Sequence, residues 1–392
     1  MHYTIDRASV QRHAAELLRC CLNLQDYSAA CTAMTLLHVL FTACSRMCSL
    51  SAACWSLATA PSRETIRKAA LKALKARDDL LKRLNRALTA EVPRALLRRP
   101  QQVAIDLVLI PYHGLPLDAE LEVYRSQARS GTSHFHAYAT AYVNYRGQRF
   151  TLALTVVERG EKMAEVLRRI FRKLSALGVT TRMTLLDRGF WSVAVIRYLR
   201  RAKKPFLMPV VLRGRKPGHA DGPSGTRVFA ARKRSGWGRY IVKAADGAVA
   251  RVALGIHCRN YNGQWGRHGR QTLVYAFWGF EASSTRWLRE TYRKRFAIET
   301  SYRQAHQARA RTCTRSPLVR LLLVGVALTL RNVWVWLHYA VLSTPRKGNC
   351  RYNPGRLTLR TMLLWLQHQA EAELGIRDEV LAERPMPQRI GA

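Results

Sequence analysis

The run Val-Ala-Ile-Asp-Leu-Val-Leu-Ile at residues 103–110 constrains the fold more than any other segment. Its length and its aliphatic residues are typical of a strand that is buried on both faces. Asp106 stands in the middle of this run, and an ionised carboxylate in an apolar strand is costly unless an arginine or another cation pairs with it. The sequence therefore predicts a buried strand that carries one negative charge to a place where a cation is held.

The hydrophobic periodicity of the chain changes at about residue 100. Residues 1–95 repeat apolar positions every three or four residues, which predicts an all-α N-terminal domain. From Gln101 onward the pattern predicts strands, first in a hairpin around Arg146-Gly147 and then alternating with helices. We expect strands over 133–145, 148–157, 181–186 and 205–211, and helices over 161–177 and 193–201. This order predicts the α/β class, with a mixed sheet flanked by helices.

Residues 212–270 break this rhythm, because they are rich in Gly, Arg and Lys. Short β-like runs between turn signals, at 226–231, 240–242 and 249–256, predict a β-rich insertion. A strand over 271–277 and long helices over 284–311 and 318–342 follow. We therefore expect a helical domain over 1–95, a main domain over 101–211 and 271–342, and the insertion over 212–270. The remaining segment, 343–392, should hold a C-terminal helix at 356–374 and a mobile tail.

The charge of the chain indicates a polyanionic partner. Lys and Arg number 65 against 25 Asp and Glu, which gives a formal charge of +40 spread along 392 residues. Such a field repels itself and favours nucleic acid, whose phosphates release counterions when they are bound. A basic ribosomal or membrane-surface protein is the alternative. A hydrophobic content of 48% with nine Trp indicates a folded core rather than a solvated basic arm.

Two further features bear on location. The nine cysteines form no Cys-x-x-Cys pair and no secretory signal is present, so we expect free thiols in a reducing cytoplasm, associated with the nucleoid if the partner is DNA. The apolar segment 318–342 is interrupted by Arg320, Arg331, Asn332 and His338, which predicts a buried core helix and no membrane partner.

Residues 51–88 have the layout of a helix-turn-helix. A short helix over 52–57 is followed by the breaker Ala60-Pro61, with Ser62 as N-cap of a basic second helix. An ordinary helical hairpin has the same layout, so DNA reading here is a hypothesis. The expected DNA-binding side chains are Arg63, Arg67 and Lys68.

Two more carboxylates accompany Asp106. Asp187 follows a buried strand at the point where the chain turns into a helix, and strand ends are where open sheets bind ligands. Glu299 lies on the expected helix over 284–311. At 100° per residue it shares one polar stripe with Tyr292, Arg295, Arg303 and His306.

Three such carboxylates suit two divalent ions, Mg²⁺ or Mn²⁺, which prefer hard oxygen ligands. A pair of these ions can activate the attacking oxygen and stabilise the leaving oxygen of a phosphodiester. The alternative for each carboxylate is a structural ion pair, since Glu299 has Arg295 and Arg303 one turn away on either side.

The segments 106–114, 187–192 and 292–303 resemble the three catalytic motifs of DDE transposases encoded by bacterial and archaeal insertion sequences. The resemblance is to the group with a Tyr-x2-Arg-x3-Glu signature on the last helix and a β-rich insertion ahead of it. It covers about residues 101–340 and implies an RNase H-like catalytic domain that uses magnesium for cut-and-paste movement of a DNA element.

The resemblance also implies roles for single residues. Asp106, Asp187 and Glu299 would be the metal ligands, and Tyr292 and Arg295 would hold DNA phosphates. The partners would be double-stranded DNA, as element ends and target, and a second copy of the chain in a homodimer on that DNA. One departure is His306, which stands where the family has Lys. Its charge depends on pH, and Arg303 or Arg309 could take its place at the phosphate.

Two other functions fit the same residues. The chain could be a transposase-derived DNA-binding regulator without catalysis, or a metal-dependent nuclease that cuts without joining. A strand-transfer assay separates the three, because they differ in whether DNA is joined, only cut, or only bound.

Overall fold

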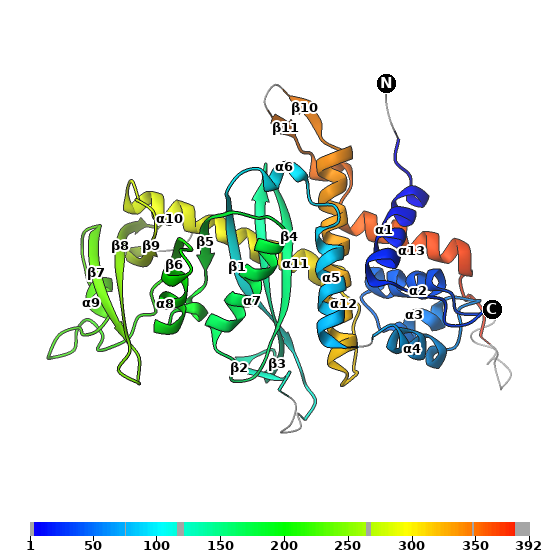
Figure 1. Ribbon diagram of the computed structural model, residues 1–392, viewed down its shortest axis with the longest axis horizontal. Helices are drawn as coiled ribbons and strands as arrows, with labels where there is room; N and C mark the ends of the chain where they lie inside the picture. The colour runs from blue at the N-terminus through cyan, green and yellow to red at the C-terminus, as the bar shows by residue number, and fades with distance from the viewer. Residues whose placement is uncertain (1–3, 75, 116–120, 264–267, 347–348, 381–392) are drawn as a thin grey trace. The chain divides into compact units, whose positions relative to one another are not determined.

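The computed structural model describes residues 4–74, 76–115, 121–263, 268–346 and 349–380 (Figure 1). It divides the chain into two compact units. Glu91–Arg303 forms one, which we call the sheet unit, and Met1–Ala90 with Gln304–Ala392 forms the other, which we call the helical unit.

The described part of the sheet unit is built on a single mixed sheet. The strands follow the order β2-β3-β1-β5-β6-β9-β8-β7, and β4 also pairs with β3. β1, β5 and β6 run parallel to one another and the remaining pairs are antiparallel. The bounds are β1 (Gln101–Pro111), β2 (Tyr124–Arg129), β3 (Thr132–Tyr145), β4 (Gln148–Val157), β5 (Thr181–Leu186), β6 (Phe206–Pro209), β7 (Gly236–Lys243), β8 (Val249–Asn262) and β9 (His268–Trp278).

Helices cover both faces of this sheet (Figure 1). α7 (Met163–Ala176) and α8 (Val193–Arg201) pack on one face, and α10 (Thr285–Arg293) packs on the other, followed along the chain by α11 (Ala297–Gln307). A core cluster under α10 joins strand and helix side chains, among them Ala104, Leu185, Leu207 and Leu288. The predicted mixed sheet with flanking helices is therefore confirmed.

Local sequence determines several of these elements. Arg146 and Gly147 have φ of 50° and 79°, so they form the two-residue turn with left-handed backbone that the predicted hairpin requires. The predicted strand over 181–186 and helix over 193–201 coincide with β5 and α8. Ser192 starts α8 by accepting a hydrogen bond from the Val195 amide.

The segment predicted as a separate insertion continues the main sheet. β9 pairs with β6 as well as with β8, so β7 and β8 extend the sheet instead of forming a domain of their own. The strand predicted over 226–231 is wrong, since this segment holds the short helix α9 (Arg227–Ala230). The Thr226 hydroxyl bonds Val211 O and the Arg213 amide, which folds the segment back onto the end of β6.

The single helix predicted over 284–311 is also wrong. A 3-10 turn, Lys294–Phe296, separates α10 from α11, which ends at Gln307. Tyr142 of β3 donates a hydrogen bond to Lys294 O at 2.8 Å, so a strand residue far away in the sequence holds this carbonyl at the break. The assumption of 100° per residue therefore does not hold across the turn.

The described part of the helical unit confirms the predicted helical character of the N-terminal region. Its longer helices are α1 (Arg7–Leu22), α2 (Ala33–Arg46), α3 (Leu50–Ser56), α4 (Arg63–Lys72), α5 (Arg77–Thr89), α12 (Pro317–Trp336) and α13 (Leu359–Leu374). The short helix α6 (Arg94–Leu97) belongs to the sheet unit, and a small hairpin of β10 (Thr344–Arg346) and β11 (Asn349–Arg351) precedes α13.

Within the described residues, one helical segment, Pro317–Val341, is long and apolar enough to cross a membrane. Its most apolar window is 94% buried inside the protein, which fits the predicted core helix. α12 packs on α5, and with α1 and α13 it belongs to the helical unit. The main domain predicted to reach residue 342 therefore ends earlier in the structure, because this helix buries its apolar surface among other helices.

Two smaller boundaries differ as well. The segment 51–88, predicted as a helix-turn-helix, holds more than two helices: the basic helix α4 ends at Lys72 and is followed by α5. Arg83 of α5 donates to the Ala73 carbonyl just beyond α4. The C-terminal helix predicted from residue 356 starts at Leu359, because Thr358 caps it by accepting from the Thr361 amide. The end of the predicted mobile tail, residues 381–392, lies outside the described residues.

Gly325 on α12 allows a close approach of α5. A Cβ atom at this position would lie 2.3 Å from Leu84 Cδ2 and 2.5 Å from Cδ1, and Leu84 has no exposed surface. We predict that Gly325→Ala lowers the free energy of unfolding by about 1–3 kcal/mol through overpacking. Chemical denaturation of the full chain measures this. Gly236→Ala is the control, since no atom lies within 4 Å of its added Cβ; equal effects would contradict the packing argument.

Candidate active site

Parallel pairing of β1 and β5 places two aspartates side by side. Ile105 pairs with Leu186, so Asp106 and Asp187 occupy the next position on neighbouring strands. Asp106 lies two residues after Ala104, and Asp187 lies two residues after Leu185, so each points to the same face of the sheet as that residue. The side chains of Ala104 and Leu185 lie in the core under α10. The two carboxylates therefore face the helix side of the sheet that carries Arg295 and Glu299.

The Asp106 carboxylate is held in a nearly closed environment. Its side chain is 13% exposed, and Oδ1 accepts a hydrogen bond of 2.9 Å from the Leu107 amide. The Tyr302 hydroxyl donates to Asp106 O at 3.2 Å and lies 2.7 Å from Thr140 Oγ1, which fixes the strand from the helix side. Burial raises the pKa of Asp106 to about 6, and the negative charge of Asp187 adds to this while Arg295 opposes it.

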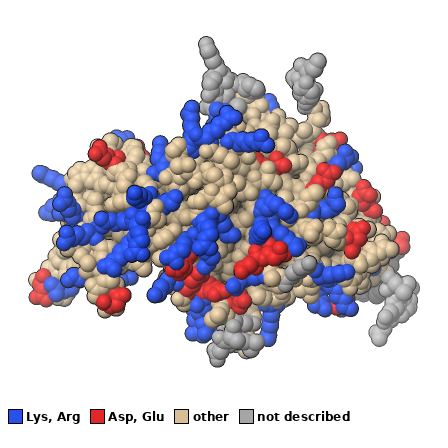
Figure 2. All heavy atoms as spheres, in the orientation of Figure 1, with Lys and Arg blue, Asp and Glu red and all other residues tan. Residues whose placement is uncertain are grey.

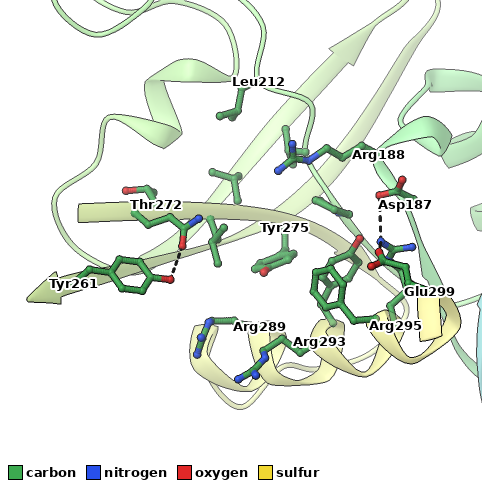
Figure 3. Close-up of a pocket in the computed structure, with 17 residues that line it drawn as sticks. Asp187, Arg188, Leu212, Tyr261, Thr272, Tyr275, Arg289, Arg293, Arg295 and Glu299 are labelled. Carbon is green, nitrogen blue, oxygen red and sulfur yellow. Dashed lines mark hydrogen bonds and ion pairs between the residues drawn. The ribbon is translucent and has the colours of Figure 1, made fainter. Parts of the chain in front are cut away.

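The 3-10 turn between α10 and α11 directs Arg295 inward. Its side chain is only 5% exposed and contacts all three carboxylates. Nη1 donates to Asp106 Oδ2 at 2.8 Å, and Nη2 lies 3.1 Å from Glu299 Oε1 and 3.6 Å from Asp187 Oδ1. Figure 3 shows the last two pairs at one end of a cavity. The structure thus brings Asp106, Asp187 and Glu299 together around one guanidinium.

The donor set fits hard divalent cations, but its present arrangement serves Arg295. Asp187 and Glu299 are 43% and 45% exposed, so a cation can reach them from the cavity side. Among the described residues, no group of three or more His, Cys, Asp or Glu side chains is placed to hold a metal ion. The Arg295 guanidinium lies against oxygens of all three carboxylates. Metal ligation by these residues stays a prediction.

The remaining residues of the predicted stripe have different environments. Tyr292 is buried, and the Arg295 guanidinium lies 5.4 Å from its ring centroid. Arg303 is exposed on α11. His306 falls in the helical unit, where burial lowers its pKa and so disfavours the positive charge at this position. Phosphate binding by these four side chains, Arg295 included, stays a prediction.

Arg63, Arg67 and Lys68 lie on α4 of the helical unit. Ser62 caps this helix as expected, accepting a hydrogen bond from the Thr65 amide. Glu64 pairs with Arg67 at 2.6 Å and with Lys68 at 3.9 Å, so part of the positive charge is compensated on the helix itself. α3 and α4 pack together, but whether α4 reads DNA stays a hypothesis.

A cavity of about 550 Å³ lies beside the carboxylates in the sheet unit (Figure 3). Asp187, Arg295 and Glu299 line one end, and at the other end the Tyr261 hydroxyl donates to Gln271. Between them the lining is basic and aromatic, with Arg188, Arg289, Arg293, Tyr275 and Tyr292. The cavity therefore joins a negative end to a positive, partly apolar groove. The sheet unit also displays many Lys and Arg side chains on the face seen in Figure 2.

Sequence reasoning missed several residues of this site. Arg289 and Arg293 are four residues apart on one helix, so the i,i+4 spacing could have indicated a shared basic face. Tyr142 and Tyr302 carried no such signal. Their contacts join positions 152 and 162 residues apart, and only the pairing of the sheet and its helices brings these positions together.

The arrangement of the sheet and its flanking helices is similar to that of a solved protein structure. A solved structure with this similarity is the cryo-electron-microscopy structure of a piggyBac transposase synaptic complex with hairpin DNA. The TM-score is 0.53 at 11% identity, and the alignment covers 99% of this chain and 84% of that chain. The sequence matches no protein-family model and no curated protein. The likeness at this identity concerns the fold, so membership of the insertion-sequence group stays a prediction.

The raised pKa of Asp106 makes the stability of the protein depend on pH. The folded protein keeps this proton up to about pH 6, whereas the ordinary pKa is 3.8. The contribution of Asp106 is therefore complete below about pH 4 and is lost as the pH rises through 6, by roughly 3 kcal/mol. The Asn side chain of Asp106→Asn cannot titrate, so this variant does not lose that contribution. The free energy of unfolding of the variant minus that of wild type should therefore increase by about this amount between pH 4 and pH 7. Denaturant titrations without divalent ions measure the difference, and a constant difference would contradict it.

Proposed function

We propose that this protein is a DDE transposase, which cleaves DNA at the ends of a mobile element in a metal-dependent reaction and joins these ends to target DNA. The observation that carries the proposal is the convergence of three carboxylates, from β1, from the end of β5 and from α11, on a single cation. One guanidinium lies within 4 Å of all three. Such a set can hold the cations that phosphodiester chemistry requires.

The fold supports the proposal in a second way. Asp106 stands on β1 and Asp187 directly follows β5, its parallel neighbour in the middle of the mixed sheet, so a rigid framework positions them. We assign an RNase H-like catalytic domain to this sheet unit. The similarity to a transposase fold covers nearly the whole chain, which includes the helical unit.

Asp106, Asp187 and Glu299 would hold two Mg²⁺ or Mn²⁺ ions. When bound, the ions would supply the activation of the attacking oxygen and the stabilisation of the leaving oxygen. The protein contributes the alignment of its own groups. Tyr302 fixes the backbone of Asp106 from α11, and Tyr142 fixes the turn before Glu299, so the sheet itself sets the separation of the three carboxylates.

The cavity beside the carboxylates provides a place for the DNA strand. Arg188, Arg289 and Arg293 can bind phosphates flanking the cut, because each guanidinium presents a fork of donors that matches a phosphate. Tyr275 and Tyr292 form apolar walls behind them. A strand laid along this groove would place one phosphodiester at the carboxylate end.

The proposed function also implies the binding partners of the protein and its location in the cell. The DNA would be double-stranded, as element ends and as target, and two copies of the chain would act together on paired ends. The protein would work in the cytoplasm, on the nucleoid. A nuclease without joining and a DNA-binding regulator are the alternative outcomes of the test.

Glu299→Gln tests the catalytic assignment. It removes one negative charge and little volume, so cleavage should fall by about 10³-fold or more while DNA binding stays within about twofold. The assay uses purified protein, Mg²⁺ and DNA that carries the repeats flanking its own gene, with a plasmid as target. Glu290→Gln is the matched control, because Glu290 pairs with Arg286 on α10, away from the carboxylates.

Joining of the element ends to the plasmid supports the transposase. Cutting without joining would favour the nuclease, and binding alone the regulator. Full activity of Glu299→Gln would contradict the assignment of this site.

The arginines of the cavity should affect the salt dependence of DNA binding. Each phosphate contact adds about 0.9 to the slope of log K against log salt concentration. We predict that Arg289→Gln and Arg293→Gln each reduce this slope by about one and weaken binding to duplexes of different sequence alike. Fluorescence anisotropy over a range of salt concentrations measures the slope. Arg286→Gln removes the same charge from a paired, exposed position on the same helix, and an equal change in this control would contradict a specific role for the cavity.

A further inference from the structure

Arg295 occupies the position that the proposed metal ions need. Its side chain is 5% exposed, and its two terminal nitrogens contact Asp106, Glu299 and Asp187 at 2.8, 3.1 and 3.6 Å. The resemblance to DDE transposases implies a phosphate-binding arginine here. The structure instead shows an arginine whose terminal nitrogens pair with the candidate metal ligands.

Electrostatics requires a cation at this place. Three carboxylates gathered around one side chain in a partly buried site repel one another, and the guanidinium reduces that repulsion. Two divalent ions on the same oxygens would place four further positive charges beside the guanidinium. The two arrangements exclude each other, so the arginine must leave the carboxylates before both ions can bind.

The structure also provides a place for Arg295 to go. Its side chain lines the same cavity as Arg289 and Arg293, so the groove proposed for DNA lies beside it. Its Nε is buried and has no hydrogen-bond partner among the described residues. A DNA phosphate arriving in the groove could accept from the guanidinium and compensate for the lost carboxylate pairs.

We propose that Arg295 is a built-in counter-ion that keeps the metal-free site closed and exchanges its carboxylate partners for a DNA phosphate when metal ions bind. This inference rests on the proposed function. It makes metal binding and DNA binding mutually dependent: the free protein binds divalent ions weakly, and DNA makes the carboxylates available.

The test measures Mn²⁺ affinity of the full chain without DNA, by electron paramagnetic resonance of free Mn²⁺. Arg295→Gln should tighten Mn²⁺ binding about tenfold or more, because it removes the competing cation. Arg286→Gln is the matched control, since it removes the same charge from an exposed position on α10 that pairs with Glu290. It should change the affinity by less than about twofold. Unchanged or weaker Mn²⁺ binding by Arg295→Gln would overturn the proposal.

A second variant covers a failure to fold. If circular dichroism shows that Arg295→Gln is unfolded, Arg295→Lys replaces it, because a single ammonium cannot pair with three carboxylates as the guanidinium fork does. Mn²⁺ binding tighter than wild type is again expected, and equal or weaker binding again overturns the inference.

Mn²⁺ affinity measured with a DNA duplex completes the test. The factor by which DNA tightens Mn²⁺ binding should be larger in wild type than in Arg295→Gln, and linkage requires the same factor for the effect of Mn²⁺ on DNA affinity. An equal factor in both proteins would overturn the exchange of partners.

The outcome also separates this inference from the function on which it rests. If Asp106→Asn and Asp187→Asn bind Mn²⁺ as tightly as wild type, the carboxylates are not the metal site and the proposed function fails together with the inference. If these variants lose Mn²⁺ binding but Arg295→Gln does not tighten it, only the role of Arg295 fails.

Discussion

The ion cluster of Arg295 with Asp106, Asp187 and Glu299 is the interaction on which the site depends. A strand aspartate that is 13% exposed would be costly alone, and its raised pKa shows how strongly burial disfavours the charged form. The guanidinium offsets this cost and links the strands to the turn between α10 and α11. The contact lies at the break between the two helices: Arg295 belongs to the 3-10 turn, and Glu299 belongs to the first turn of α11.

The supporting groups are neutral and come from the sheet and from α11. Tyr142 and Thr140 of β3 reach across β1 to the turn and to α11, where they contact Lys294 O and the Tyr302 hydroxyl. Asp106 of β1 pairs with Thr140 of β3, and this antiparallel register sets the positions of Thr140 and Tyr142 relative to Asp106. Hydrogen bonds from the sheet and from α11 hold the charged groups in place. The cavity beside them is lined by Arg188, Arg289 and Arg293, where we propose that DNA binds.

Much of the architecture was predictable because local patterns determine it. The hairpin at Arg146-Gly147 follows from backbone preference, and β5 and α8 follow from periodicity and a serine cap. The carboxylates of Asp106 and Asp187 were recognisable because a charge in or directly after an apolar strand needs a partner. The predicted boundaries that were wrong have one cause in common, which is that long-range contacts override local preference. Tyr142 helps to hold the break before α11, and α12 buries its apolar surface among the helices of its own unit.

The sequence by itself determined that the chain contains a mixed sheet between helices, that its charge suits nucleic acid, and which three carboxylates to examine, because these depend on residue type and spacing. Only the tertiary structure decided that the predicted insertion extends the sheet, that the helix breaks at Lys294, and that Arg295 pairs with the carboxylates. These outcomes depend on which distant segments meet. The free energy of burying a side chain beside its partner exceeds the small local preferences that can be read along the chain.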